Sequence, residues 1–255
     1  MIYLEINKKS IYTVALFSII ILITSCENVR NLQLKNAVLE RDFKKVKELI
    51  RKGADPNTNI GSGSVLGHAI DANDLGTVKF LVNQGADINA AKPLTPLQEA
   101  AVSGYTEIAG FLIKKGAKMK GSPVLDRAPP LELAAIMGRW EVFKLLIKNG
   151  ADIYNTSSDV SRSMLHSASK GGNPQIISYL IDKGIDVNAT NQNGEIPLHN
   201  LLKNDSINEE SIQILIENGA NPEIEDNNGK TPRDIARENG HLDTLEKILS
   251  RHKEQ

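Results

Sequence analysis

The sequence has a single cysteine, Cys26, among 255 residues, which excludes a disulfide within the chain and any multi-cysteine metal site. Aromatic residues make up only 4% of the chain, and this scarcity favours thin, closely stacked helices over a core of large rings. Lys and Arg number 30 against 31 Asp and Glu, so there is no basic excess to attract nucleic acid. The 40% hydrophobic and 24% charged residues are typical of folded globular proteins.

A long apolar run occurs only near the N-terminus. Lys8 and Lys9 precede an uncharged stretch over residues 11–23, which Thr24, Ser25 and Cys26 follow. This run is short for a membrane-spanning helix but has the length and the basic flank of a signal-peptide core. We therefore expect residues 1–25 to form a signal peptide that is removed from the mature protein.

The end of this segment carries a second pattern. Leu22 lies four residues and Ile23 three residues before Cys26, and the small residue Ser25 directly precedes it. This segment resembles a bacterial lipobox. The resemblance implies cleavage before Cys26, lipidation of its thiol, and a periplasm-facing lipoprotein anchored in a membrane of the cell envelope, for which two or three acyl chains suffice. An uncleaved signal anchor with an incidental cysteine is the alternative.

The rest of the chain repeats itself. An element similar to Gly-Ala-Asp begins at glycines that are 31–35 residues apart: Gly53, Gly85, Gly116, Gly150, Gly184 and Gly219. A second element similar to Thr-Pro-Leu-His begins at Thr95, Pro129, Ser163, Ile196 and Thr231. Sequence repetition at this period predicts a stack of short structural units, each packed on its neighbours.

The spacing separates helices from loops. Twenty residues lead from Pro96 to Gly116 and again from Pro130 to Gly150, whereas the stretch from each glycine to the next proline slot varies between 11 and 14 residues. A stretch of constant length is packed, and a stretch of variable length is a loop. The sixth unit departs, with Leu201 in a slot that holds alanine elsewhere and two additional residues before Gly219.

Both elements resemble those of the ankyrin repeat, over essentially the whole chain after Cys26. The resemblance implies an all-α solenoid of about seven helix-turn-helix repeats with β-turn finger loops. We expect residues 26–31 to be a short tether and residues 32–255 to form the ankyrin-repeat domain. Small residues such as Ala100, Ala134 and Ala168 would let neighbouring repeats approach closely.

A search for reactive groups gives little. His166 and His199 occupy the fourth position of the second element, where the family uses imidazole to tie the finger loop to the helix. The glycines at 61 and 63 lack the lysine of a phosphate loop, and no HExxH spacing or comparable metal-ligand pattern occurs. We therefore expect no enzymatic activity, no metal and no cofactor; an unrecognised hydrolase is the remaining enzymatic alternative.

The family resemblance implies a protein partner bound on the concave face of the repeats. Val102, Ile136 and Met137 are apolar at positions that usually point toward this face, and Met119 and Tyr154 are candidates from the finger loops. We expect these five residues to contact the partner. In the alternative interpretation, the loop 118–129 folds back and covers the patch. For Trp140, packing between helices is the preferred role.

The sequence thus predicts a lipid-anchored, monomeric scaffold or adaptor that binds an unidentified protein in the bacterial cell envelope. The alternative is a surface-exposed or secreted factor that engages host proteins. The identity of the partner and the choice between inner and outer membrane stay open.

Overall fold

The computed structural model describes residues 27–60, 63–91, 93–120, 128–154, 156 and 163–253. Cys26 and the expected signal peptide lie outside the described residues, as do residues 121–127 of the loop expected to cover the apolar patch. The chain divides into two compact units, one ending at Asp87 and one running from Ile88 to Gln255.

The first unit contains two helix pairs and a small hairpin. Its helices span residues 27–39, α2 (Phe43–Arg51), α3 (Val65–Asp71) and α4 (Leu75–Asn83), and its strands are β1 (Asn59–Ile60) and β2 (Gly63–Ser64), which pair antiparallel. Residues 27–31, which the sequence assigned to a tether, belong to the first helix. Phe43 of α2 packs edge-on against Phe80 of α4, with ring centroids 5.8 Å apart, and joins the two pairs.

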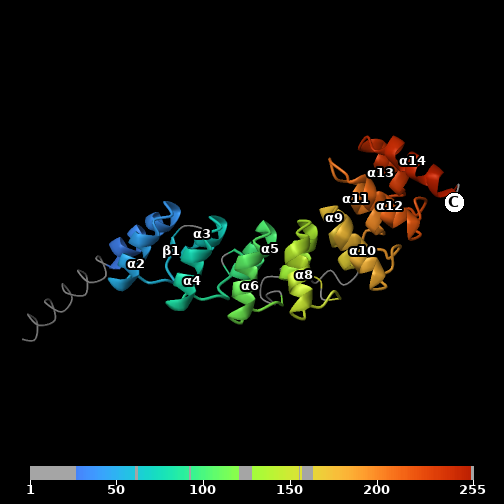
Figure 1. Ribbon diagram of the computed structural model, residues 1–255. Coiled ribbons are helices and arrows are strands. Elements are labelled where there is room, and N and C mark those ends of the chain that lie inside the picture. Colours follow the sequence, from blue (N-terminus) through green and yellow to red (C-terminus); the bar gives the residue numbers. More distant parts are fainter. Residues whose placement is uncertain are drawn as a thin grey trace, which may run out of the picture. The chain divides into compact units, whose positions relative to one another are not determined.

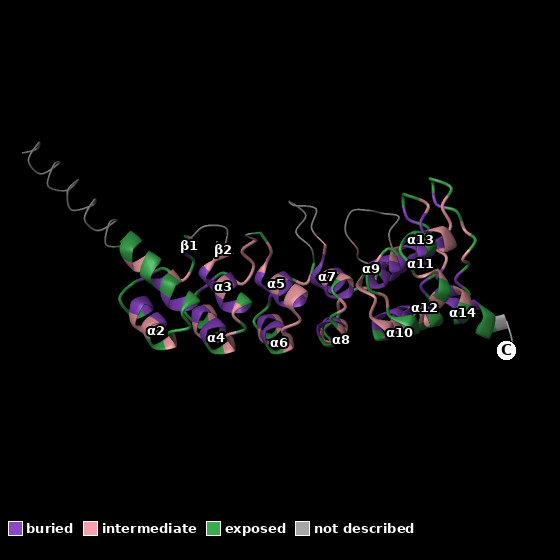
Figure 2. Cartoon of the chain, turned by 90° about the horizontal axis from the view of Figure 1, so that it is seen from above, coloured by how far each residue is buried: buried purple, intermediate pink, exposed green. Residues whose placement is uncertain are grey.

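The second unit stacks its helices in pairs. The first helix of each pair is α5 (Pro96–Ser103), α7 (Pro130–Ile136), α9 (Met164–Gly171), α11 (Pro197–Leu202) or α13 (Pro232–Glu238). The second is α6 (Thr106–Lys114), α8 (Trp140–Lys148), α10 (Pro174–Asp182), α12 (Glu209–Glu217) or α14 (Leu242–Lys253). We call these the inner and the outer helices. Each inner helix packs on the next inner helix and each outer helix on the next outer one, as two rows (Figures 1 and 2).

The inner helices begin where the sequence places their caps. The Thr95 hydroxyl accepts the N–H of Gln98, and the Gln98 side chain in return accepts the N–H of Thr95 at 2.9 Å. This reciprocal pair satisfies two backbone donors that the start of a helix leaves free. Pro96 follows at the first helical position, where its missing N–H costs nothing.

Small residues and aliphatic residues share the core in the expected way. Ala100, Ala134 and Ala168 are completely buried between neighbouring inner helices, and Leu201 fills the same slot in α11. On the outer helices, Phe143 is completely buried, and Trp140 stacks on it with centroids 6.2 Å apart. Trp140 also contacts the ring of Tyr179 on α10, so it has the predicted role of packing between helices.

These observations confirm the predicted fold, a repetition of helix-turn-helix units. Among the described residues, no helix combines the length and the apolar character needed to cross a bilayer.

Candidate binding surface

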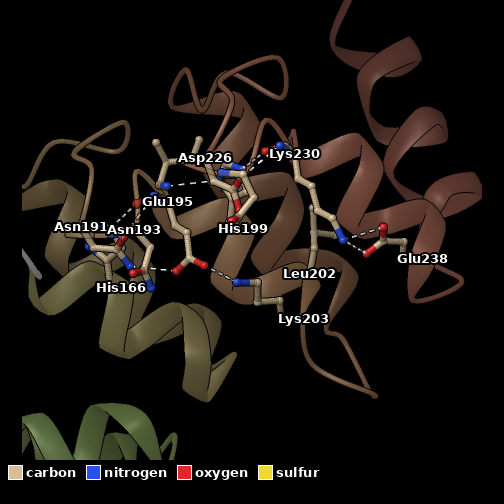
Figure 3. A network of polar contacts seen from close by, with 12 residues as sticks. His166, Asn191, Asn193, Glu195, His199, Leu202, Lys203, Asp226, Lys230 and Glu238 are labelled. Carbon is tan, nitrogen blue, oxygen red and sulfur yellow. Dashed lines mark hydrogen bonds and ion pairs between the residues drawn. The ribbon is translucent and has the colours of Figure 1, made fainter.

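Two buried histidines, one on α9 and one on α11, each connect their inner helix to the next finger loop. The Nδ1 atom of His166 accepts the N–H of Ser163, and its Nε2 atom lies 2.9 Å from the carbonyl oxygen of Glu195 in the next repeat. His199 repeats this arrangement, with the N–H of Ile196 and the carbonyl oxygen of Lys230 as its partners (Figure 3). Both imidazoles therefore have the expected structural role. Burial lowers the pKa of His199, and the hydrogen bond to Lys230 offsets only part of this effect.

A buried carboxylate lies between these histidines. Glu195 is 7% exposed; its side chain forms an ion pair with Lys203 and accepts a hydrogen bond from Asn191 Nδ2 at 2.9 Å (Figure 3). Burial acts to raise the pKa of Glu195, but the hydrogen bonds from Lys203 and Asn191 outweigh it and hold the pKa below its usual value. The carboxylate therefore stays charged and neutralises Lys203.

In the fourth repeat, Glu132 occupies the position that His166 and His199 hold in later repeats. The residue at its helix cap is Pro129, which has no N–H for a side chain to accept. Glu132 is completely buried and instead accepts a hydrogen bond from the Ser167 hydroxyl of the next inner helix at 3.0 Å. This carboxylate therefore links two repeats, which gives it a structural explanation.

Asparagine side chains also connect successive finger loops, separately from the histidines. Asn188 donates its amide to the carbonyl oxygen of Gly219 at 2.8 Å, and its side-chain oxygen accepts the N–H of Asn221 at 2.9 Å. Asn57 makes the same pair of bonds to Gly85 and Asp87 in the first unit. In the fourth repeat Tyr154 holds this position, with 72% of its surface exposed. The aromatic side chain replaces an amide that joins repeats elsewhere.

The five residues predicted to bind a partner fall into two groups. Val102 and Ile136 are half-buried near the ends of α5 and α7, and Met137, which caps α7, is 43% exposed. Met119 is half-buried in the loop after α6, and Tyr154 follows α8. The two helices of a pair run antiparallel (Figure 1). The two loop residues follow outer helices, whereas the first three residues lie at the ends of inner helices, so the two groups lie at opposite ends of the helix pairs. Val102 and Ile136 occupy equivalent positions on adjacent inner helices, each two residues after the buried alanine.

A polar cavity of about 450 Å³ opens beside the inner helices α9 and α11. Its lining combines both ends of the repeat: loop residues Asn191, Gln192, Asn193 and Glu195, and helix or turn residues Lys170, Asn200, Lys203 and Asn204. Reasoning from the sequence missed this cavity. Lys170 and Lys203 lie two residues after the buried residue of their inner helix, as Val102 and Ile136 do. This change from apolar to charged residues at one repeated position is the sequence signal that could have revealed the cavity.

The described residues contain no group of three or more His, Cys, Asp or Glu side chains able to hold a metal ion. His166, His199 and His241 each lie within hydrogen-bond distance of a backbone carbonyl oxygen of another repeat. Each of these rings therefore connects two repeats.

Comparisons with known proteins agree with this architecture. A family model for ankyrin repeats in three copies matches residues 34–122 and 164–255, and one for ankyrin repeats in many copies matches residues 131–181. No curated protein sequence shows significant similarity. Among solved structures, the chain is similar to the human ASB11 ankyrin repeat domain, with a TM-score of 0.70 and 25% sequence identity over 84% of this chain and 96% of that one.

Ankyrin repeats are typically non-enzymatic modules, and their presence indicates a scaffold for protein–protein interaction. The repeat spacing, the paired helices, the histidine links and the family models together show that the chain belongs to the ankyrin-repeat family.

Proposed function

We propose that this protein is a non-enzymatic scaffold of the bacterial cell envelope, anchored by lipid at Cys26, that binds a protein partner across its inner helices in the second unit. The observation that carries the binding surface is the apolar step at the end of α7, formed by the half-buried Ile136 and the exposed Met137. Clusters of exposed apolar side chains of this kind favour protein interfaces.

The neighbourhood of this step supports an interface. Val102 holds the equivalent position on α5, and its carbonyl oxygen accepts a hydrogen bond from Arg139 Nε at 3.0 Å. This bond fixes the end of α5 against the turn that follows Met137. A rigid surface binds at a lower entropic cost than a flexible one, because fewer groups must be ordered on association.

Capture experiments with matched variants test the surface. We expect Ile136→Asp and Met137→Asp to abolish capture of a partner from an envelope extract while the melting temperature stays nearly unchanged. Lys148→Asp is the control, because Lys148 is also exposed but lies on the outer helix α8, away from the inner helices. A large loss of stability in the Ile136 and Met137 variants would instead mean that these side chains are part of a covered core.

The anchor is proposed from the lipobox-like sequence, and features of the following helix support a position close to a membrane. The described part of the first helix, residues 27–39, follows Cys26 directly in the sequence, and it exposes Val29 at 55%, Leu32 at 51% and Leu39 at 53%. These three residues share one side of the helix, since their spacings correspond to whole turns. Apolar side chains next to an acylated residue can lie against a bilayer surface.

Mass spectrometry of the membrane-extracted protein tests the anchor. We expect a mature chain that begins at Cys26 and carries acyl groups, and we expect Cys26→Ser to prevent both cleavage and acylation. An unmodified N-terminus that retains residues 1–25 would overturn the proposed anchor. Labelling of intact cells with a membrane-impermeant reagent then separates a periplasm-facing scaffold, which is protected, from a surface-exposed factor, which is labelled.

A further inference from the structure

The inner helices of the second unit present equivalent side chains in a row. These side chains lie two residues after the buried alanine slot of each repeat: Val102, Ile136, Lys170, Lys203 and Glu238. Because neighbouring inner helices pack on one another in register, these positions follow each other along one face. We call this row the inner-helix ladder. It is apolar in the first two repeats and charged in the following three.

Two of the three charges on the ladder are neutralised within the protein. Lys203 pairs with the buried carboxylate of Glu195, and Glu238 pairs with Lys230 Nζ, which lies 2.8 Å from both carboxylate oxygens. Lys170 is exposed and forms no ion pair within the residues that the structure describes. The ladder therefore carries one net positive charge, located at Lys170.

The apolar part of the ladder, which ends at Ile136, is directly followed by the charged Lys170. A Cβ atom on Gly171 would lie 2.1 Å from the carbonyl oxygen of Ala135 and 2.9 Å from that of Ile136. The end of α9 thus touches the end of α7, and Lys170 follows Ile136 on the ladder without an intervening gap. A ligand that reaches over Ile136 and Met137 therefore arrives at Lys170.

The polar cavity starts at this lysine. Lys170 and Lys203 both line it, together with the amide side chains of Asn193 and Asn200. Amide N–H groups and a lysine ammonium are donors that suit a carboxylate. Glu195 also lines the cavity, but its charge is offset by Lys203, so the cavity retains the positive charge of Lys170.

Building on the proposed function, we propose that the partner presents an extended segment in which an apolar side chain packs on Ile136 and Met137 and a nearby Asp or Glu side chain enters the polar cavity to pair with Lys170. Packed helices lie about 10 Å apart and an extended chain advances about 3.3 Å per residue, so the two side chains are about three residues apart.

Peptide selection tests this inference without knowledge of the partner. The full chain in detergent is panned against a phage-displayed library of random dodecapeptides. We expect the selected peptides to be enriched in Asp or Glu close to an aliphatic residue. In Lys170→Glu we expect this enrichment to disappear and the affinity of the selected peptides to fall about tenfold, as expected for the loss of one charge pair.

Matched variants separate the possible failures. Lys148→Glu makes the same charge change on the outer helix α8, where Lys148 is exposed, and should bind the peptides like the wild type. Equal melting curves show that Lys170→Glu is folded. If the peptides need Ile136 but show no acidic preference, or bind Lys170→Glu unchanged, this inference fails and the proposed function stands. If Ile136→Asp also leaves binding unchanged, both fail.

Discussion

The Nε2 atom of His199 lies 3.0 Å from the carbonyl oxygen of Lys230, while the Nδ1 atom of the same ring accepts the N–H of Ile196 at 3.1 Å. The ring is therefore neutral, with its proton on Nε2, and it joins α11 to the loop before α13. A second proton would have to sit on Nδ1, directly against an N–H donor. Acid should weaken this link.

The first prediction concerns pH. Burial lowers the pKa of His199 in the folded state below the ordinary value of 6.5, so the unfolded chain binds more protons as the pH falls below 6.5. The contribution of His199 to the free energy of unfolding is complete above pH 6.5 and is lost as the pH falls through the lower, folded-state pKa. The stabilising contribution of Glu195, whose pKa is lowered in the folded state, is complete above the ordinary value of 4.5 and is lost only as the pH falls below it, in a separate window.

His199→Gln isolates this effect. Gln98 shows that glutamine can make both bonds of the slot, because its Oε1 accepts the N–H of Thr95 and its Nε2 donates to the carbonyl oxygen of Ala128 at 2.8 Å. We expect the variant to be about as stable as the wild type at neutral pH. Urea unfolding between neutral pH and about pH 5 should show a flatter pH dependence for the variant, by at most about one proton, because a single titrating group is removed. Equal slopes for the two proteins would contradict this account.

The second prediction concerns the contact between α7 and α9. Gly171→Ala places a Cβ atom 2.1 Å from the backbone oxygen of Ala135, which cannot be accommodated without moving one helix. We expect a loss of about 2 kcal/mol or more in the free energy of unfolding. Gly110→Ala is the control: on α6 the new Cβ atom would meet only Leu145 Cδ2 at 3.7 Å, so helix propensity should stabilise that variant by about 0.5–1 kcal/mol. Similar effects of both variants on denaturant unfolding would refute the close contact.

The third prediction concerns Tyr154. Tyr154→Asn restores the amide that, at the equivalent Asn188, bonds Gly219 and Asn221 of the next repeat. We expect a gain of about 1 kcal/mol in the free energy of unfolding, because a hydrogen bond contributes about 0.5–1.5 kcal/mol. The reverse change, Asn188→Tyr, should destabilise the protein by a similar amount. Partner capture by Tyr154→Asn should weaken at the same time, since the exposed ring is lost; a variant that loses stability would show that the position cannot accept the bridge.

The sequence predicts most of this fold because the periodic features are local. Thr95 and Pro96 set the start of a helix by their own chemistry, and Ala134 and Ala168 recur at a fixed distance from it. The slot histidines are predicted with their roles for the same reason. Each of these residues acts within its own repeat or on the adjacent one.

The binding surface is harder to predict because it depends on pairing between side chains from different loops. The sequence does not indicate that Glu195 is buried and neutralises Lys203, and this pairing leaves Lys170 as the charged position. Nor does the sequence indicate that Tyr154 stands where an asparagine bridge is found elsewhere, because the bridge is visible only when the partners of Asn188 are known.

Site-specific photo-crosslinking in living cells tests the central claim most directly, which is that the inner-helix face of the second unit receives the partner. A photoreactive phenylalanine analogue replaces either Met137, exposed at the end of α7, or Lys148, exposed on the outer helix α8. The account predicts a discrete protein adduct from position 137 and none from position 148. Adducts of equal yield at both positions, or an adduct at position 148 alone, would contradict it.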